Sequence, residues 1–349
     1  MGRNAAIIGG GIGGLTTAVA LHRMGWRVTV HERQTTTPST GTALGIWPSA
    51  LRALDTLGLG DEVRERGCPQ TSGALRRPDG SIIARIGTGK SGDRVHLLSR
   101  PALLAILRRA AEKAAAGKVA DLRFGETITE TRTLSERYDV VVAADGVFSR
   151  TREELFGVKA RFAGTAAWRG TLDDAPTSTF TEFWGAGVKF GITPQEGRRA
   201  NWFASAAAGE GDFHPGVERD ELRKLFGNWP GPVHDLLERI TEEGILRHDI
   251  YVTPKLPSYV KGNVALIGDA AHAMTPDLGR GACEAMIDAV SLAACLESGG
   301  LTAYDKNRRR TTQRLARMAG AASWMTRQRH AVPLRDGVLK VTMLAGPPD

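Results

Sequence analysis

The segment NAAIIGGGIGGLTTAVALHRMGWRVTVHE, residues 4–32, indicates how this chain folds. Its pattern predicts a short buried strand, a glycine turn, a helix and a second strand, at Asn4–Ile8, Gly9–Gly14, Leu15–Met24 and Arg27–His31. A strand, a helix and a strand in this order form a βαβ unit, which builds a parallel sheet. The apolar start also resembles a secretory signal, but its glycines and the missing small-residue cleavage site argue against export.

The glycine turn fits the pattern GxGxxG at Gly9, Gly11 and Gly14. The first glycine allows a tight turn, the second lets the backbone approach a pyrophosphate, and the third lets the helix pack closely on the strand. Free N–H groups at the helix start then face the phosphates. Glu32 ends the second strand, where a carboxylate binds ribose hydroxyls. The segment therefore predicts a dinucleotide site, without distinguishing NAD from FAD.

Two later segments, YDVVVAAD at residues 138–145 and NVALIGD at residues 263–269, each place a buried strand before an aspartate. These aspartates are Asp145 and Asp269, and ligands collect at such strand ends in open α/β sheets. A glycine-flanked helix start at Gly279–Gly281 offers further backbone N–H groups to an anion or a polarised carbonyl.

Together these segments resemble the flavin-dependent aromatic hydroxylases with the p-hydroxybenzoate hydroxylase fold. The resemblance rests on GGGIGGL with Glu32-Arg33, on VVVAADGVFSRTR at residues 140–152, and on NVALIGDAAHAMTPDLGRGACEAMIDA at residues 263–289. The three motifs occur in the family order and span most of the chain. The salicylate-hydroxylase-like group of group A flavoprotein monooxygenases is the most similar, because the longer polyketide hydroxylases have an extra C-terminal domain.

The resemblance implies an α/β fold, with a Rossmann-type FAD-binding domain, an interleaved mixed β-sheet substrate domain and C-terminal helices. The FAD-binding domain would comprise residues 1–71, 87–159 and 261–300. The substrate domain would comprise residues 72–86 and 160–260, and the helical segment residues 301–349. Period-2 patterns predict strands in the substrate domain at Phe180–Trp184, Val188–Thr193 and Asn201–Ser205, with a hairpin marked by Gly185 and Gly187.

The resemblance also implies FAD as the cofactor. The residues expected to bind it are Gly9, Gly11, Ile12, Gly13, Gly14, Glu32, Arg33, Ala43, Arg100, Asp145, Gly268, Asp269, Pro276, Leu278, Gly279, Arg280 and Gly281. The first glycines would hold the pyrophosphate, Glu32 the adenosine ribose and Arg33 the adenine. Arg100, Asp145 and Asp269 would lie near the ribityl and phosphate groups. Pro276 would lie beside the isoalloxazine ring, and the N–H groups of Leu278 and Gly279 at its pyrimidine edge.

Some residues depart from the common family sequence. Asp277 stands where Asn is usual, Arg280 where Gln is usual, Ile287 where Glu is usual, and Ala43 where Gly is usual. Arg280 adds a cation and Asp277 an anion near the expected flavin. The two side chains either tune the flavin or pair with each other across one turn, and the sequence leaves both alternatives open.

Aromatic side chains of the middle segment suggest a substrate pocket. Trp47, Trp184 and Trp202 either line an apolar pocket for a planar ring or belong to the core. Lys189, on the same predicted strand as Gly191, either pairs with a substrate carboxylate or phenolate, or is a solvated edge lysine. The candidate catalytic residues are Pro276 and Lys189, and the candidate substrate residues are Trp47, Trp184, Lys189, Gly191 and Trp202. For His272 a structural hydrogen bond is favoured over proton transfer.

The resemblance implies an NAD(P)H- and O2-dependent monooxygenase that works through a flavin C4a-hydroperoxide. It would hydroxylate or epoxidise an electron-rich aromatic or unsaturated small molecule. Two alternatives stay open: a flavin-dependent dehydrogenase or reductase on the same fold, and a non-catalytic FAD protein that binds a small aromatic.

Composition limits the partners. Residues 301–349 hold ten Lys or Arg and three Asp, a net of +7, which leaves +1 of the total +8 for the first 300 residues. We expect this basic stretch to be a solvated helix, from Tyr304 to about Arg329, and not a nucleic-acid platform. The three scattered cysteines favour the cytoplasm. No apolar run suits a membrane span and no spacing suits a metal; we expect a monomer or homodimer.

Overall fold

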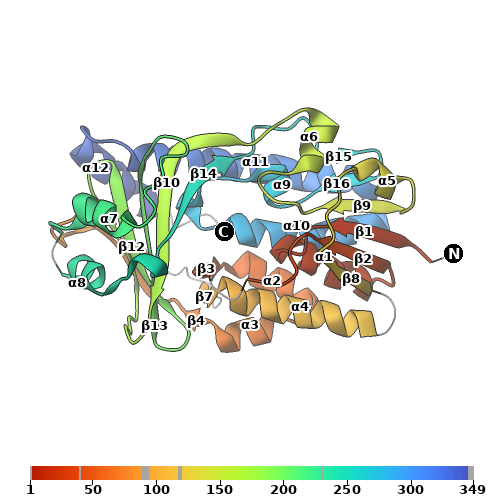
Figure 1. Cartoon of the computed structure of the whole chain (residues 1–349), viewed down its shortest axis with the longest axis horizontal. Helices are drawn as coiled ribbons and strands as arrows, with labels where there is room; N and C mark the ends of the chain where they lie inside the picture. Colours follow the sequence, from red (N-terminus) through yellow and green to blue (C-terminus); the bar gives the residue numbers. More distant parts are fainter. Residues whose placement is uncertain (1, 39–40, 88–93, 117–119, 230, 345–349) are drawn as a thin grey trace.

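A six-stranded sheet, in the order β15-β16-β9-β1-β2-β8, contains the glycine-rich segment. The computed structural model describes residues 2–38, 41–87, 94–116, 120–229 and 231–344. The strands are β1 (Asn4–Ile8), β2 (Arg27–Glu32), β8 (Ala120–Phe124), β9 (Val140–Ala143), β15 (Val260–Lys261) and β16 (Val264–Leu266). Every pairing is parallel except that of β15 with β16, so this is the expected Rossmann-type sheet (Figure 1).

The strand order reverses at β1, because the chain runs from β1 to β2 and β8 on one side and later returns as β9 on the other. Ligands of open α/β sheets bind at such a reversal, beyond the carboxyl ends of the strands. Helix α1 (Ile12–Arg23) connects β1 to β2 and begins before the predicted Leu15, because the last glycines of the turn already belong to its first turn.

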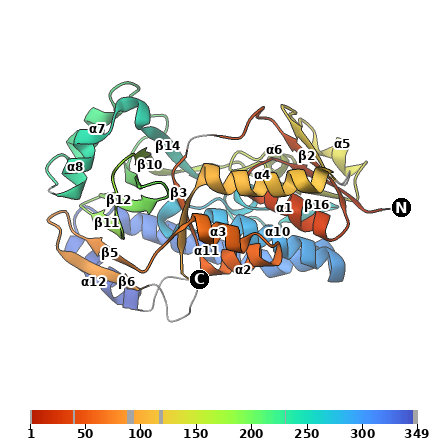
Figure 2. The same ribbon diagram turned by 90° about the horizontal axis from the view of Figure 1, so that it is seen from below.

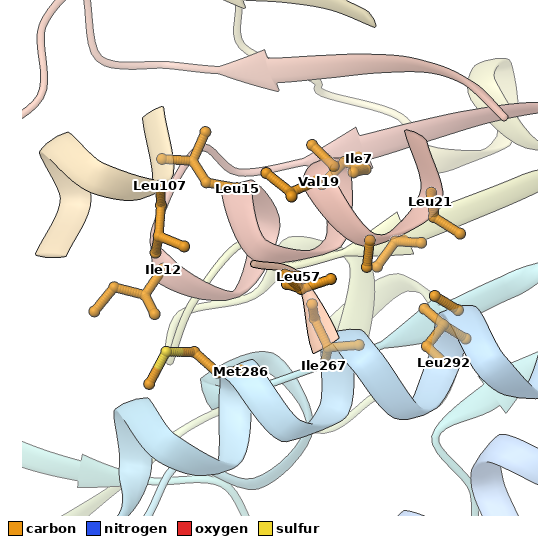
Figure 3. Close-up of a cluster of buried hydrophobic side chains, with 14 of the residues drawn as sticks. Ile7, Ile12, Leu15, Val19, Leu21, Leu57, Leu107, Ile267, Met286 and Leu292 are labelled. Atoms are coloured by element: carbon orange, nitrogen blue, oxygen red, sulfur yellow. The ribbon is translucent and has the colours of Figure 1, made fainter. Parts of the chain in front are cut away.

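The main core lies between α1 and helix α10 (Gly281–Ser298), which follows the last motif (Figure 3). Apolar residues from both helices and from the neighbouring strands are buried there, among them Ile7, Ile12, Leu15, Val19, Leu21, Ile267, Met286 and Leu292. Burial of apolar area at about 25 cal/mol per Å² is the main stabilising term for such a core. The contact also brings the N-terminal ends of the two helices to the same side of the sheet.

A second, seven-stranded sheet has the order β14-β10-β13-β12-β11-β5-β6. Its strands are β5 (Ser72–Arg76), β6 (Ile82–Gly87), β10 (Arg161–Leu172), β11 (Phe180–Trp184), β12 (Val188–Gln195), β13 (Arg199–Ala207) and β14 (Leu246–Val252). All three predicted strands of this region are confirmed. So is the hairpin, in which the Gly185 N–H donates to the Val188 carbonyl at 2.8 Å. Strands β5 and β6, which precede β8 and β9 in the chain, thus share one mixed sheet with strands β10 to β14, which follow them.

One face of this sheet is covered by helices α7 (Glu218–Phe226) and α8 (Pro232–Arg239), which lie at the outer end of the molecule in both views (Figures 1 and 2). Side chains of the sheet and the two helices form a second core, including Phe190, Trp202, Phe226, Trp229 and Leu236. Because side chains alternate along a strand, the residues between these core positions lie on the opposite face.

The remaining elements surround the two sheets. A small antiparallel sheet has the order β3-β7-β4, with β3 at Ala43–Ile46, β4 at Cys68–Pro69 and β7 at His96–Ser99. The remaining helices are α2 (Pro48–Thr56), α3 (Gly60–Arg66), α4 (Arg100–Ala116), α5 (Thr131–Ser135), α6 (Arg150–Phe156), α9 (Asp269–His272), α11 (Gly300–Thr326) and α12 (Val332–Leu344), with 3-10 turns η1 (Glu242–Gly244) and η2 (Pro276–Leu278). None of the described helices has the length and apolarity that a membrane crossing requires.

The proposed domain boundaries remain a prediction. Their ranges include residues 1, 39–40, 88–93, 117–119, 230 and 345–349, which lie outside the described residues. The predicted basic helix is present as α11, but it is not uniformly solvated, because Arg308 is only 8% exposed.

Arg308 belongs to a buried ionic network between α10 and α11. Its guanidinium contacts Glu284, and its Nε donates to Asp288 Oδ1 at 2.7 Å. The other Asp288 oxygen accepts from the Gly268 N–H at 2.9 Å and lies 2.6 Å from His272 Nε2. Removing one partner of such a buried network leaves an uncompensated charge, which costs several kcal/mol. Asp288 is therefore the hydrogen-bond partner in the structural role that was expected for His272.

The network makes stability depend on pH. Burial alone would lower the pKa of His272, but the Asp288 carboxylate outweighs it and raises the pKa above 6.5. A raised pKa in the folded state stabilises the protein below the unfolded value, and this contribution is lost as pH rises through the folded value.

We expect His272→Asn to lower the free energy of unfolding by about 1–3 kcal/mol near pH 6, because it removes the charged partner of Asp288. The difference from wild type should shrink as pH rises above 6.5, the usual pKa of histidine. Urea unfolding across this pH range measures it, with His234→Asn, on the exposed surface of α8, as the matched control. Parallel pH profiles for wild type and His272→Asn would contradict the ionic role of His272.

Candidate active site

The glycine turn between β1 and α1 is tight at its ends and open in its middle. A Cβ on Gly9 would lie 2.4 Å from the Ala144 carbonyl oxygen, and one on Gly14 would lie 1.9 Å from the Gly9 carbonyl oxygen. A Cβ on Gly11 would meet no described atom within 4 Å. Side chains are therefore excluded at the first and third glycines by packing, whereas Gly11 borders free space.

The start of α1 offers uncompensated N–H groups to that space. Gly11 is the N-cap, and among the described residues no side chain caps the helix and no acid lies in its first turn. The first N–H groups of a helix lack partners within the helix and carry a partial positive charge. An anion beside Gly11 would accept hydrogen bonds from these N–H groups and would be attracted by their partial positive charge.

Glu32 braces the turn from the end of β2. Its carboxylate accepts from the N–H of Gly10 at 2.5 Å and from the N–H of Gln34 at 2.8 Å. Arg33, the next residue, is exposed. The carboxylate expected to bind a ribose is thus held in place by two backbone donors before any ligand arrives.

The two motif aspartates lie at the carboxyl ends of adjacent strands, β9 and β16. Asp145 Oδ2 accepts from the Thr151 N–H at 3.2 Å, whereas Asp145 Oδ1 is buried and has no partner among the described residues. Buried polar atoms normally have a hydrogen-bond partner, so this oxygen points to a water or a ligand hydroxyl. Asp269 is exposed and begins α9, after Gly268 in a left-handed conformation, with φ +56°.

Arg152 organises this edge, and the sequence analysis assigned it no role. It is 1% exposed, and its guanidinium donates to the carbonyls of Val147, Val158 and Ala270 at 2.7, 2.9 and 3.1 Å. It therefore ties the loop after β9 to the start of α9. Two of these carbonyls are within six residues of Arg152, but Ala270 is 118 residues away, so no local pattern could have revealed the link to α9.

The turn before α10 carries the residues expected beside the flavin ring. Pro276 and Leu278 lie in η2, Gly279 has φ +60°, and Gly281 begins α10. The Trp47 indole N–H donates to the Gly279 carbonyl at 3.2 Å, so Trp47 packs against this turn.

The two charged departures have other partners in the structure. Arg280 is 4% exposed and donates to Glu284 Oε1 at 2.8 Å, one turn into α10. Asp277 Oδ1 lies 3.0 Å from Lys189 Nζ instead. Arg280 thus joins the ionic network of α10, and Asp277 joins the turn to the seven-stranded sheet.

Lys189 is not a solvated edge lysine, because its side chain is 4% exposed. Its ammonium lies 3.0 Å from Asp277, 3.6 Å from Glu182 and 5.5 Å from the centre of the Trp184 ring. Burial alone would lower the pKa of Lys189, but the two carboxylates raise it well above its ordinary value. The lysine is therefore a buried cation already paired within the protein.

The other candidate substrate residues lie on different faces of the sheet. Trp184 is on the Lys189 side and donates to Glu182 Oε2 at 2.9 Å. Gly191 is on that side too, and the Phe203 ring occupies the space of its missing side chain, 2.1 Å from a built Cβ. Trp202 lies on the opposite face, stacked on Phe190 at 5.8 Å between ring centres. Trp202 is thus a core residue, by strand alternation.

The edge near α4 completes the interface between the sheets. The Arg100 N–H donates to the Thr42 carbonyl at 3.0 Å, and the Ala43 N–H donates to Asn201 Oδ1 at 3.0 Å. Arg100 is exposed.

A small cavity of about 10 Å³, which borders Pro276 and Asp277 and reaches α11, has room for one water. Within the described part of the chain no cluster of side chains suits a metal ion.

The open position at Gly11 makes a direct test of the expected FAD site possible. Gly11→Ala should lower the amount of FAD retained on purification by about tenfold or more, because the added methyl group occupies the space for the pyrophosphate. Its thermal stability without FAD should stay close to wild type, since that methyl group meets no described atom. Flavin absorbance and thermal melts measure the two effects.

Gly14→Ala is the contrasting variant, because its methyl group would collide with the Gly9 carbonyl. It should lose stability as well as FAD. Full FAD content in Gly11→Ala would rule out this placement of the pyrophosphate.

The free space at Gly11, the uncapped helix start and the unpaired buried oxygen of Asp145 all fit a bound dinucleotide. Comparison with known proteins identifies which one. A family model described as FAD binding domain matches residues 3–319.

Two curated relatives and two solved structures agree with that match. The aurachin C monooxygenase/isomerase of Stigmatella aurantiaca is 34% identical over 309 residues, covering 84% of this chain and 81% of the relative. The FAD-dependent urate hydroxylase of Mycolicibacterium vanbaalenii is 30% identical over 312 residues, covering 82% and 78%. The structure of Klebsiella pneumoniae HpxO with FAD and uric acid is similar, with a TM-score of 0.85, 27% identity and 99% and 97% coverage. A salicylate hydroxylase structure, 21% identical over 99% and 95% of the two chains, shares the fold, with a TM-score of 0.79.

Because the family model spans most of the chain and the relatives are hydroxylases and monooxygenases, this chain belongs to the FAD-binding family of flavin-dependent monooxygenases.

Proposed function

We propose that this enzyme uses NAD(P)H and O2 to insert one oxygen atom into a small aromatic or unsaturated substrate, held between FAD and the seven-stranded sheet. The observation that carries the proposal is the contact between Lys189 on the sheet and Asp277 in the turn before α10. It brings the non-core face of the sheet against the turn that would hold the flavin ring. In balance, substrate, NAD(P)H, a proton and O2 give the oxygenated product, NAD(P)+ and water.

The chain provides binding and electrostatics. Bound FAD supplies hydride acceptance and oxygen activation. The N–H groups at the start of α1 hold the pyrophosphate beside Gly11, and Glu32 holds the ribose. Asp145 and Asp269 orient hydroxyls and water at the neighbouring strand ends. No described side chain needs to act as an acid or a base in this scheme.

The start of α10 stabilises negative charge at the pyrimidine edge of the ring. Helix N-termini favour anions through their free N–H groups and dipole. Arg280, the N-cap of α10, adds a cation there, held in position by Glu284. Arg308 also contacts Glu284, which links Arg280 to the ionic network of α10 and α11.

Lys189 acts as a positioning residue, through Asp277. The carboxylates of Asp277 and Glu182 already hold its ammonium, so the substrate contact that the sequence suggested is not part of this proposal. The pair fixes the distance between the sheet and the turn that carries Pro276, which would lie beside the flavin ring. A ring substrate then lies over Gly191 and Phe203.

The relatives support a planar ring as substrate. One of them is named for urate, a planar heterocycle, and a solved structure holds uric acid with FAD. The two other functions would show themselves differently. A dehydrogenase would reduce its flavin with substrate alone, and a binding protein would take up a small aromatic without consuming NAD(P)H. That the protein is a monomer or a homodimer, and that it is located in the cytoplasm, both remain predictions.

The purified protein should be yellow and should oxidise NADH or NADPH faster in the presence of its substrate. A panel of phenols, heterocyclic ring compounds and polyenes, read by mass spectrometry, should reveal a product that has gained one oxygen atom. Gly11→Ala, expected to lack FAD, is the matched control. Flavin reduction by a panel compound without NAD(P)H, and no oxygenated product, would favour the dehydrogenase.

Lys189→Met tests the positioning role. The substitution leaves Asp277 and Glu182 buried without their cation, so the free energy of unfolding should fall by about 3–5 kcal/mol. We expect the variant to have a lower kcat than wild type. Its KM should stay close to the wild-type value, both for charged and for neutral substrates. The double variant Lys189→Met, Asp277→Leu should recover part of the stability, because apolar replacement of a buried pair is tolerated. A rise in KM confined to anionic substrates would instead place Lys189 in direct contact with substrate.

A further inference from the structure

Three basic side chains lie near one another between the two sheets, and none of them has an acidic partner among the described residues. Arg169 is on β10, His248 is on β14, and Arg100 is the first residue of α4. The sequence motifs gave no role to Arg169 or His248. We call these three residues the basic cluster.

Strand register places Arg169 on the substrate face of the sheet. Arg169 pairs with Phe203 on β13, and Phe203 pairs with Gly191 on β12. Directly paired residues share a face, so this row lies on the same face as Lys189, two residues along β12. His248 pairs with Ala167, two residues before Arg169, and is its diagonal neighbour on that face.

Arg169 is half-buried, and its guanidinium lacks the partners that a cation in such a position normally has among the described residues. Its Nε is buried and unbonded, and within the described residues no hydrogen bond or ion pair is formed by its side chain. Burial and the nearby cation Arg100 lower the pKa of Arg169. Burial and the arginines Arg169, Arg100 and Arg247 lower the pKa of His248. Among the described residues, the charges that act on Arg169 and His248 are therefore positive.

A cluster of like charges is unfavourable unless an anion binds to it and pairs with the cations. Burying an unpaired charge costs several kcal/mol, whereas a guanidinium that pairs with a carboxylate forms two parallel hydrogen bonds. The exposed side chains of Arg100 and His248 leave the cluster open to a ligand. The Phe203 ring, lying across Gly191, provides a flat apolar surface beside Arg169 for the body of that ligand.

We propose that the basic cluster binds an anionic group of the substrate, a carboxylate or an ionised ring hydroxyl, while the ring lies on Phe203. This inference rests on the proposed function and narrows its substrate class to anionic ring compounds. Arg169 provides the charge-assisted hydrogen bonds. His248, which is neutral at neutral pH, provides an N–H donor, and Arg100 adds long-range attraction.

The test compares anionic and neutral probes of the same shape. Wild-type holoenzyme is titrated with benzoate and benzamide, and with 2-naphthoate and 2-naphthamide, by equilibrium dialysis and by flavin absorbance. We expect the carboxylate to bind about tenfold tighter than the amide in at least one pair, equivalent to about 1.4 kcal/mol. Arg169→Gln should abolish the preference, and Arg169→Lys should keep part of it. Arg161→Gln, an exposed arginine on the same strand, is the matched control and should keep it fully.

Three kinds of result would overturn the proposal. One is an absence of preference for the carboxylate in both wild-type pairs, or an equal preference in Arg169→Gln. The second is a loss of FAD affinity in Arg169→Gln with the probe preference intact, which would assign the cluster to the cofactor phosphates. The third is a change confined to NADH or NADPH affinity, which would assign it to the dinucleotide. Because binding needs no turnover, the preference can hold even where oxygenation is absent, so the two proposals fail separately.

Discussion

The close approach of the glycine turn to the end of β9 is the constraint on which the rest of the structure depends. A side chain at Gly9 would collide with the Ala144 carbonyl, and one at Gly14 with the Gly9 carbonyl. Glycine at these positions lets α1 start directly at the point where the strand order reverses. The first N–H groups of α1 and the Asp145 carboxylate consequently lie at one edge, beside the free space at Gly11.

The packing of α1 on α10 extends this constraint to the second half of the site (Figure 3). Because the two helices share one core, the position of α1 also sets where α10 begins. The ionic network of Glu284, Asp288 and Arg308 then holds α10 to α11, and Asp288 also binds the Gly268 N–H. Two helix starts thus converge on the proposed FAD site, and buried groups hold each of them in place.

Buried charge is treated in three ways in this molecule. The network of α10 and α11 pairs each cation with carboxylates, and Lys189 has two carboxylates near its ammonium. Arg169 has none. The first two arrangements fix the relative positions of helices, turn and sheet, where a wrong geometry would leave a charge unpaired. The third stands on the face where a substrate would lie, and there an unpaired cation gives binding energy to an anion.

Local sequence predicted the elements that depend on short-range patterns. The βαβ unit, the hairpin strands from Phe180 to Ser205 and the helix of the last motif are where the periodicities place them. The start of α1 was predicted too late, because Gly13 and Gly14 belong to a helix despite their low helix propensity. Tight packing on β1 overrides that propensity.

Motifs in the sequence predicted the Rossmann-type sheet, the FAD family and the glycines of the tight turn, because each motif consists of residues close together in the chain. Which charges pair depends on the tertiary structure. It pairs Lys189 with Asp277 and Arg280 with Glu284, turns Trp202 into the core, and leaves Arg169, beside His248, without a partner among the described residues. The reason is physical: a side chain's partner across two sheets depends on register and on which face of a strand it occupies, and one residue of shift reverses that face.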